Sequence, residues 1–316
     1  MLDVIIVNYN MKDLLEESLN SIFKSDFRAN VIVVDNASSD NSIEMIKKFK
    51  VRLIANKENL GLTKALNQAI KKSHSKYIQI MHPDVAVNKD TFSKMIEFME
   101  KNKEVAALGC KVKHPDGKIF PSAHRSPRPR AFVLEMMPIP RSIARKFNIY
   151  GLFMRNIDFN KLHEVEIIAS AFLLLRRDVL NETGLFDEDF TNWTSEWDLC
   201  YRIKQKNWKI IYYPGTEVIH YESYVPKNKL KFSKEIEYKF KKGYVVADKV
   251  QKMLFLFYKK HYPKYDYYIF KFLSISNLLL KSFLKSFTIF KEDSRSRIYN
   301  YFKTIKVCLE DGYNKK

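Results

Sequence analysis

The chain has 316 residues, 46% of them hydrophobic, which is enough to bury a core in one large domain with an appendage or in two modest domains. Its three cysteines lie far apart without a CxxC pair, which argues against a disulfide framework or a structural zinc site. The formal net charge is +19, of which residues 221–316 supply +13, so phosphate-rich partners are favoured: anionic lipid, nucleotide or nucleic acid.

The N-terminal part alternates short apolar runs with segments of helical spacing. The runs predict strands at 4–7, 31–34, 51–54 and 77–81, and the helical segments lie at about 15–23, 42–49 and 62–73. Such alternation predicts parallel βαβ units, that is, an α/β fold with helices on both faces of a central sheet. The chain lacks GxGxxG and GxxxxGK[ST], which argues against a Rossmann dehydrogenase and a P-loop NTPase.

The following part is less regular. Residues 114–160 form a Pro- and Arg-rich stretch that predicts a long irregular loop, and long loops in compact domains are more often functional than idle. Regular secondary structure is predicted again after this loop: a strand at 167–176, a helix at about 196–205, and strands at 210–213 and 218–220.

The basic tail predicts helices over 230–262 and 267–290. In the second, polar residues recur at helical spacing as a narrow strip within an apolar helix, and the longest charge-free run (272–280) is too short to span a bilayer. Two interpretations stay open: a helix lying on an anionic membrane surface, or one packing on the catalytic domain or a second subunit. Met1-Leu2-Asp3 leads directly into a strand without a basic leader, so we expect a cytoplasmic protein, peripheral on the inner face of the membrane.

Acidic residues follow two of the predicted strands. Asp35 ends the second strand and Asp84 follows the fourth in YIQIMHPD. Ligands of open α/β sheets bind at the carboxyl ends of strands. Asp35 can therefore accept hydrogen bonds from a ribose or base, or belong to an Asx turn, and Asp84 can hold a divalent metal against a diphosphate.

Further candidates surround these two carboxylates. Gly61 opens the helix at 62–73, where free N–H groups favour an anion that Lys64 could also reach. His82 and His220 could complete a Mn²⁺ or Mg²⁺ site shared with substrate phosphate, or be structural histidines.

Glu196 and Asp198 offer two carboxylates at the start of a helix. One of them can act as general base towards an attacking hydroxyl. Alternatively, both only complement the helix dipole.

Taken in order, these motifs resemble family 2 glycosyltransferases with the GT-A fold, most closely the bacterial rhamnosyltransferase-like branch. The segments that carry the resemblance are VIIVNYN (4–10), VVDNASSDNS (33–42), NKENLGLTKALNQAI (56–70), MHPDVAV (81–87), ASAFLLLRRDVLNETGLFDEDF (169–190), SEWDLCYRIKQKNWKIIYYPGTEVIHYES (195–223) and FLFYKKHYP (255–263). The resemblance implies a GT-A glycosyltransferase domain at 1–225, with a mainly parallel sheet, and a basic helical extension at 226–316.

The resemblance also implies roles for individual residues. Glu196 takes the position of the base, with Asp198 beside it, Trp193 faces the acceptor, and Asp84 with His220 holds the metal. The residues implied to bind the nucleotide-sugar are Asn8, Tyr9, Asp35, Asn59, Gly61, Lys64, Asn67, His82 and Asp84. Two positions depart from the usual pattern: His82 stands where relatives have Asn or Asp, and Glu196 where they have Asp.

The implied reaction is an inverting transfer of rhamnose or another hexose from a nucleotide-diphosphate donor to a hydroxyl of a glycan or lipid-linked acceptor, in cell-surface polysaccharide synthesis. The first alternative is a catalytically impaired GT-A-like protein that binds nucleotide-sugar without turnover, suggested by the two departures. The second is nucleic-acid binding, which we do not expect because the chain lacks a recognisable module for it. The oligomeric state does not follow from the sequence.

Overall fold

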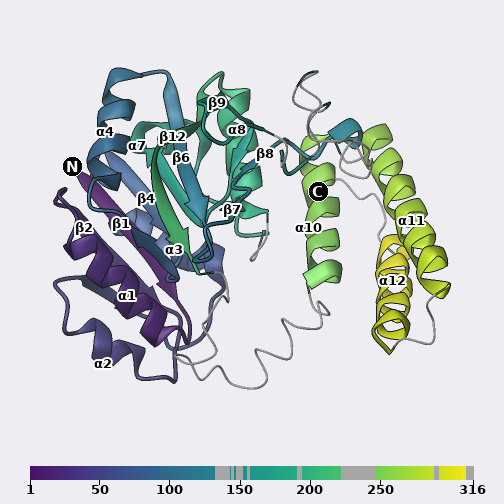
Figure 1. Cartoon of the computed structure of the whole chain (residues 1–316), viewed down its shortest axis with the longest axis horizontal. Coiled ribbons are helices and arrows are strands. Elements are labelled where there is room, and N and C mark those ends of the chain that lie inside the picture. The colour runs from purple at the N-terminus through teal and green to yellow at the C-terminus, as the bar shows by residue number, and fades with distance from the viewer. Residues whose placement is uncertain are drawn as a thin grey trace. The chain divides into compact units, whose positions relative to one another are not determined.

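A computed structural model describes residues 1–131, 143, 146, 152–154, 157–190, 194–221, 246–287 and 292–310 (Figure 1). The chain divides into two compact units, Met1–Ser126 with Phe153–Leu230 and Pro127–Leu152 with Lys231–Lys316. The domain boundary predicted at 225/226 lies outside the described residues and stays a prediction.

The first unit begins with the predicted βαβ units. The strands β1 (Leu2–Asn8), β2 (Asn30–Asp35), β3 (Arg52–Ala55) and β4 (Tyr77–Met81) lie in the order β3-β2-β1-β4 and are all parallel. They are connected by α1 (Lys12–Phe23), α2 (Ser42–Ile46) and α3 (Leu62–Lys72). Val4, Ile5 and Ile6 are fully buried, as expected of a central strand covered on both faces. The parallel arrangement predicted for this part is confirmed.

Beyond β4 the sheet becomes mixed. β11 (Phe172–Arg176) lies antiparallel between β4 and β6 (Val105–Lys113), and β12 (Lys209–His220) pairs parallel with β6 and antiparallel with β5 (Val85–Val87). Neither β5, nor β6, nor the helix α4 (Thr91–Lys101) between them is among the elements predicted from the sequence. The remaining elements are β7 (Ile119–Phe120), β8 (Ala123–His124), β9 (His163–Glu164), α7 (Arg177–Thr183) and α8 (Ser195–Gln205).

Two strand predictions need correction. The strand predicted at 167–176 is divided into β10 (Ile167–Ile168), which pairs with β8 in a separate two-stranded sheet, and β11. The two strands predicted at 210–213 and 218–220 are one strand, β12, whose pairing with β6 shifts register between Tyr213 and Glu217. The shift accommodates Pro214 and Gly215, which look like a turn in the sequence but form a bulge within a strand.

The C-terminal part of the second unit contains the helices α10 (Val246–His261), α11 (Lys264–Ser286) and α12 (Glu292–Glu310). Residues 230–245 of the predicted Lys-rich helix lie outside the described residues, and the sequence analysis did not assign α12. Within the described residues, no helix combines the length and the apolar character needed to cross a bilayer.

A buried carboxylate ties the start of β1 to the loop before β4. Asp3 is 3% exposed and accepts hydrogen bonds from the hydroxyls of Ser73 and Ser75, each at 2.6 Å, and from Asn30 Nδ2 at 2.9 Å. Burial alone would raise its pKa, but these hydrogen bonds outweigh that effect and lower it to about 2.

Replacing Asp3 with Asn should therefore destabilise the fold at neutral pH. The carboxylate contributes stability that is present above its unfolded pKa of 3.8 and is lost as the pH falls through about 2. The expected cost is about 2 kcal/mol, measured by urea denaturation at pH 7. Asp90→Asn, which alters a half-exposed carboxylate, is the control; a cost equal to that of Asp3→Asn would contradict the assignment.

Candidate active site

The strand register brings the predicted residues to one edge of the sheet. Asn8 at the end of β1 pairs with Asp35 at the end of β2, and Ile6 pairs with Met81 at the end of β4. Because these strands are parallel, the residues that follow them emerge on the same side. Val85 pairs with His220 of β12, which brings a late segment of the chain to this edge.

At the end of β1, Asn8 is held by Asp35. Asn8 Nδ2 donates to Asp35 Oδ1 at 2.9 Å and to Ser38 Oγ at 3.1 Å, while the Ser38 N–H donates to Asp35 Oδ2 at 2.9 Å. Both carboxylate oxygens of the fully buried Asp35 are thus engaged. Asn8 Oδ1 is buried and has no hydrogen-bond partner among the described residues, so it is an acceptor open to a ligand N–H. Next to it, Tyr9 is half exposed.

The start of α3 is a tight turn built by asparagines. Asn59 Oδ1 accepts from the Gly61 N–H at 2.9 Å and from Asn36 Nδ2 at 3.2 Å, and Gly61 has a φ of 80° that disfavours other residues. Lys64 is exposed one turn later. Asn59 and Gly61, predicted to line the donor pocket, therefore shape the turn from which α3 begins.

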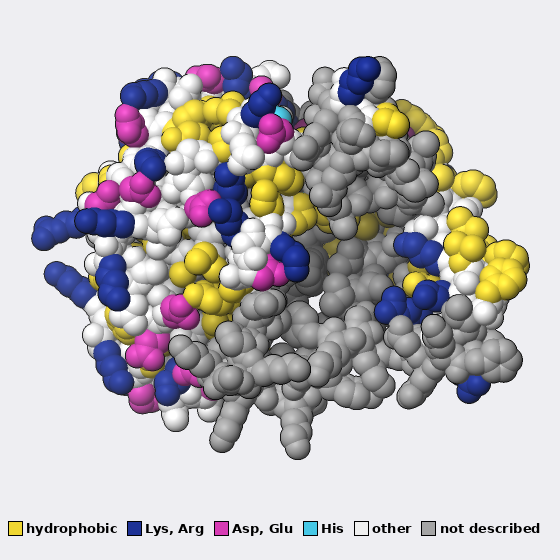
Figure 2. Space-filling view, viewed as in Figure 1, with side chains coloured by type: hydrophobic (Ala, Val, Ile, Leu, Met, Phe, Trp, Pro, Cys, Tyr) yellow, Lys and Arg dark blue, Asp and Glu magenta, His cyan; other side chains and the backbone are white. Residues whose placement is uncertain are grey.

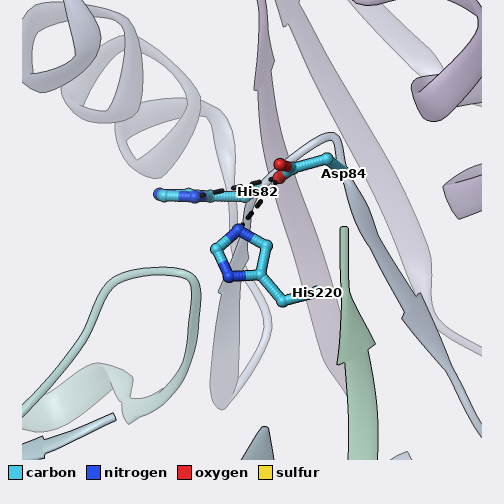
Figure 3. Close-up of side chains that lie close together, drawn as sticks. All are labelled: His82, Asp84 and His220. Atoms are coloured by element: carbon cyan, nitrogen blue, oxygen red, sulfur yellow. Dashed lines mark ion pairs between the residues drawn. The ribbon is translucent and has the colours of Figure 1, made fainter. Parts of the chain in front are cut away.

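Asp84 lies at the centre of a cluster with two histidines (Figure 3). Its Oδ1 is 3.3 Å from His220 Nε2 and 4.0 Å from His82 Nδ1, and ligand atoms of all three side chains lie within 4.8 Å of one another. Backbone hydrogen bonds hold the segment that carries His82 and Asp84. The His82 N–H donates to Ala171 O at 3.1 Å, and the Tyr221 N–H donates to Asp84 O at 2.8 Å.

In this cluster the pKa of the Asp84 carboxyl and that of the His82 imidazole are both lowered, which favours an ionised Asp84 and a neutral His82. Burial alone would raise the pKa of Asp84, but the hydrogen bond from His220 and the charges of His220 and His82 outweigh it and lower the pKa. Burial lowers the pKa of His82, and the neighbouring His220 adds a smaller effect in the same direction. The carboxylate of Asp84 opposes both but does not outweigh them. A carboxylate and a neutral imidazole are the forms that bind metal ions.

The donor set fits a divalent cation. It offers one oxygen and two imidazole nitrogens, and the buried His220 Nδ1 has no hydrogen-bond partner within the described part of the chain. His82, which the resemblance assigned to the donor pocket and which the residues alone left open as a metal ligand, joins Asp84 and His220 here. The position that departs from the family pattern thus still carries a side chain able to bind a metal.

Glu196 lies in the first turn of α8 and is 9% exposed. Burial raises the pKa of its carboxyl to about 7, although hydrogen bonding with Ser170 opposes the shift. Ser170 precedes Ala171, whose carbonyl holds the N–H of His82. Two adjacent residues thus connect the candidate base with the candidate metal cluster.

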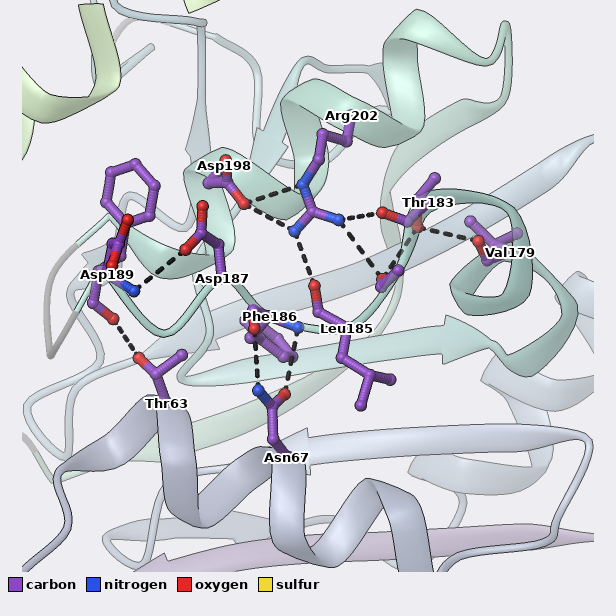
Figure 4. Close-up of polar contacts among 12 residues, drawn as sticks. Thr63, Asn67, Val179, Thr183, Leu185, Phe186, Asp187, Asp189, Asp198 and Arg202 are labelled. Carbon is purple, nitrogen blue, oxygen red and sulfur yellow. Dashed lines mark hydrogen bonds and ion pairs between the residues drawn. The ribbon is translucent and has the colours of Figure 1, made fainter. Parts of the chain in front are cut away.

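Asp198 has a different environment, shown in Figure 4. Its Oδ2 accepts from Arg202 Nη2 at 2.6 Å and Nε at 2.9 Å, and Arg202 also donates to the carbonyls of Leu185, at 2.8 Å, and Thr183. This places Asp198 in a clamp that joins α8 to the loop at 183–190. The i, i+4 spacing of Asp198 and Arg202 is the sequence signal that could have revealed the pair.

Asn67 holds the same loop from α3 (Figure 4). Its Nδ2 donates to Phe186 O at 2.8 Å and to Glu188 Oε1 at 2.9 Å, and its Oδ1 accepts from the Phe186 N–H at 3.2 Å. Thr63 also donates to a loop carbonyl, that of Phe190. The predicted donor-pocket residue Asn67 thus has its side chain committed to the loop that precedes Glu196.

The predicted acceptor residue Trp193 lies outside the described residues, as do residues 132–142 of the irregular loop predicted at 114–160. The neighbouring Trp197 is described: it is 6% exposed and packs against His124, with ring centroids 5.6 Å apart. Its role is in the packing of α8.

The fold and the strand-end cluster define a GT-A glycosyltransferase. Solved structures support the fold: a mannosyltransferase from Pyrobaculum calidifontis in complex with GDP-Man and Mn²⁺ has a TM-score of 0.55 and 17% identity, with 100% of this chain and 88% of that one covered. S. aureus TarS 1–349 in complex with UDP-GlcNAc has a TM-score of 0.50 and 16% identity, covering 96% and 90%. The chain belongs to glycosyl transferase family 2, whose sequence profile matches residues 3–184.

Curated relatives have related activities. An N-acetylglucosaminyl-diphospho-decaprenol L-rhamnosyltransferase of Mycobacterium tuberculosis is 23% identical over 250 residues, covering 71% of this chain and 77% of the relative. A poly-beta-1,6-N-acetyl-D-glucosamine synthase of Staphylococcus epidermidis is 22% identical over 216 residues, which are 65% of this chain and 46% of the relative. The predictions of the family, the GT-A fold and glycosyltransferase activity are confirmed.

The clamp between α8 and the loop gives a stability prediction. Arg202→Met leaves the buried Asp198 without its cation, so we expect a loss of about 3 kcal/mol, measured by urea denaturation. Lys204→Met, on the same helix, removes the partly exposed partner of the exposed Glu164 and should cost less than about 1 kcal/mol. Equal effects of the two substitutions would contradict the clamp.

Proposed function

We propose that this glycosyltransferase inverts configuration as it transfers a hexose, with rhamnose the first candidate, from a nucleotide-diphosphate donor to a hydroxyl of a glycan or lipid-linked acceptor in cell-surface polysaccharide synthesis. The observation that carries the proposal is the connection between the Asp84 cluster and Glu196 through Ser170 and Ala171. The printed activity of the mycobacterial relative supports the choice of rhamnose and of a lipid-linked acceptor.

Asp84, His82 and His220 would hold Mn²⁺ or Mg²⁺. When bound, the metal supplies positive charge that stabilises a departing nucleoside diphosphate. The Mn²⁺ in the GDP-Man complex of the Pyrobaculum mannosyltransferase supports a divalent cation. Asn8 and Tyr9 stand at the next strand end, where Asn8 Oδ1 can accept a hydrogen bond from the nucleoside.

Glu196 is proposed to accept the proton of the acceptor hydroxyl as that oxygen attacks the anomeric carbon from the face opposite the diphosphate. Its pKa of about 7 suits this task, because a base works best when its pKa lies near the operating pH. Asp198 is a positioning residue in this scheme, since it holds Arg202 and the loop at 183–190.

The base assignment predicts a pH dependence. Only ionised Glu196 can accept a proton, so kcat/KM should rise with pH and level off above about 7. Glu196→Gln should lower kcat at least about a hundredfold and remove this ionisation, while donor binding persists. The exposed Glu97→Gln is the control. A wild type no faster than Glu196→Gln, with donor bound, would favour a binding protein without turnover.

The metal assignment is tested by thermal shift with a panel of nucleotide-sugars, with and without Mn²⁺. A donor at a hundred times its Kd stabilises the folded state by about 2.7 kcal/mol, which raises the Tm measurably. We expect Asp84→Asn to lose the Mn²⁺-dependent part of the shift and Asp90→Asn, which alters a half-exposed carboxylate, to retain it. An unchanged Mn²⁺ response in Asp84→Asn would rule out the cluster as the metal site.

A further inference from the structure

The helix α11 is apolar on the outside and partly polar on the inside. Phe272 and Phe283 of this helix are 69% and 60% exposed and its C-cap Phe287 is 71% exposed, whereas Ser274 and Ser282 are 2% and 6% exposed. Figure 2 shows the corresponding hydrophobic side chains gathered along this helix. A helix of a water-soluble domain shows the reverse arrangement, because it buries its apolar stripe.

The exposed residues form a continuous stripe. Spacings of three, four and seven residues connect them, which places them on one broad helix face. Over 23 residues this face is about 34 Å long. The exposed apolar side chains on or beside it are Tyr265, Tyr268, Ile269, Phe272, Leu279, Leu280, Phe283, Leu284 and Phe287.

The stripe is not needed for the core of its own unit. The inner face of α11 packs against α10 through Phe270, whose ring centroid lies 4.3 Å from that of Tyr258 and 5.5 Å from that of Phe255. Ser274 Oγ accepts from Gln251 Nε2 of α10 at 3.2 Å. An apolar face of this size that remains exposed marks an interaction surface.

The charge around the stripe indicates the partner. The outer face of α12 combines exposed Tyr299 and Phe302 with exposed Lys303 and Lys306, and residues 221–316 together carry a net charge of +13. A second copy of this chain would bring the same positive charge and be repelled, whereas anionic lipid supplies the opposite charge.

We propose that α11 and α12 dock on an anionic membrane surface, with the stripe of α11 inserted among the lipids at the interface. Small buried residues such as Ser274 and Ser282, with large apolar residues outside, are the arrangement of helices that pack beside lipid. Basic and aromatic side chains are typical of interfacial helices. The inference goes beyond the proposed transfer reaction, since it concerns where the enzyme is held.

The test is co-sedimentation of the full chain with vesicles. We expect at least tenfold tighter binding to phosphatidylcholine vesicles containing phosphatidylglycerol than to phosphatidylcholine alone, with the difference reduced by salt. Phe272→Gln/Phe283→Gln should weaken binding to the anionic vesicles at least tenfold. Phe23→Gln/Leu162→Gln, which alters two half-exposed residues of the first unit, is the matched control and should bind as the wild type.

Two further measurements separate the alternatives. The Tm shift caused by nucleotide-sugar should be equal in wild type and Phe272→Gln/Phe283→Gln. Donor binding is therefore tested separately from vesicle binding, and a failure of the one assignment is distinguished from a failure of the other. Analytical ultracentrifugation reports self-association. A dimer that the double substitution converts to monomer, without vesicle binding by the wild type, would overturn the proposal in favour of a self-association surface. Equal vesicle binding by wild type and double variant would also overturn it.

Discussion

The parallel register of β1, β2 and β4 is the constraint on which the site depends. Because Asn8 pairs with Asp35 and Ile6 with Met81, three chain segments leave the sheet at one level, and their polar residues meet there. The antiparallel pairing of His220 with Val85 then brings β12 to the same edge. A shift of one residue would turn each side chain to the opposite face of its strand and separate the cluster.

In this site the pKa values of two buried carboxyls shift in opposite directions. Asp84 lies beside imidazoles, whose hydrogen bond and charge lower its pKa despite burial. At Glu196 the effect of burial outweighs that of its hydrogen bonds, so its pKa rises to about 7. Environments that move the pKa values of two carboxyls apart assign them different tasks: Asp84 suits a metal ligand and Glu196 a base. The nearby Asp198 is bound to Arg202 and serves to hold the loop.

The second unit leaves large apolar side chains exposed on its surface. Its helices bury aromatic residues such as Phe255 and Phe270 between them, yet the outer face of α11 remains apolar. A small helical unit gains stability from its inner contacts, and the surplus outer face is available for binding. The candidate active site and the proposed membrane-docking surface thus belong to separate units of one chain.

The sequence by itself determined the βαβ succession, because apolar periodicity and turn residues are local, and hence the strand-end positions of Asp35 and Asp84. It also determined the family, through the spacing of its motifs. Only the tertiary structure decided that Pro214 and Gly215 lie within one strand, that His82 joins His220 around Asp84, and which face of α11 is exposed. These outcomes depend on contacts between residues far apart in the chain, and the local pattern of a segment does not specify its partner.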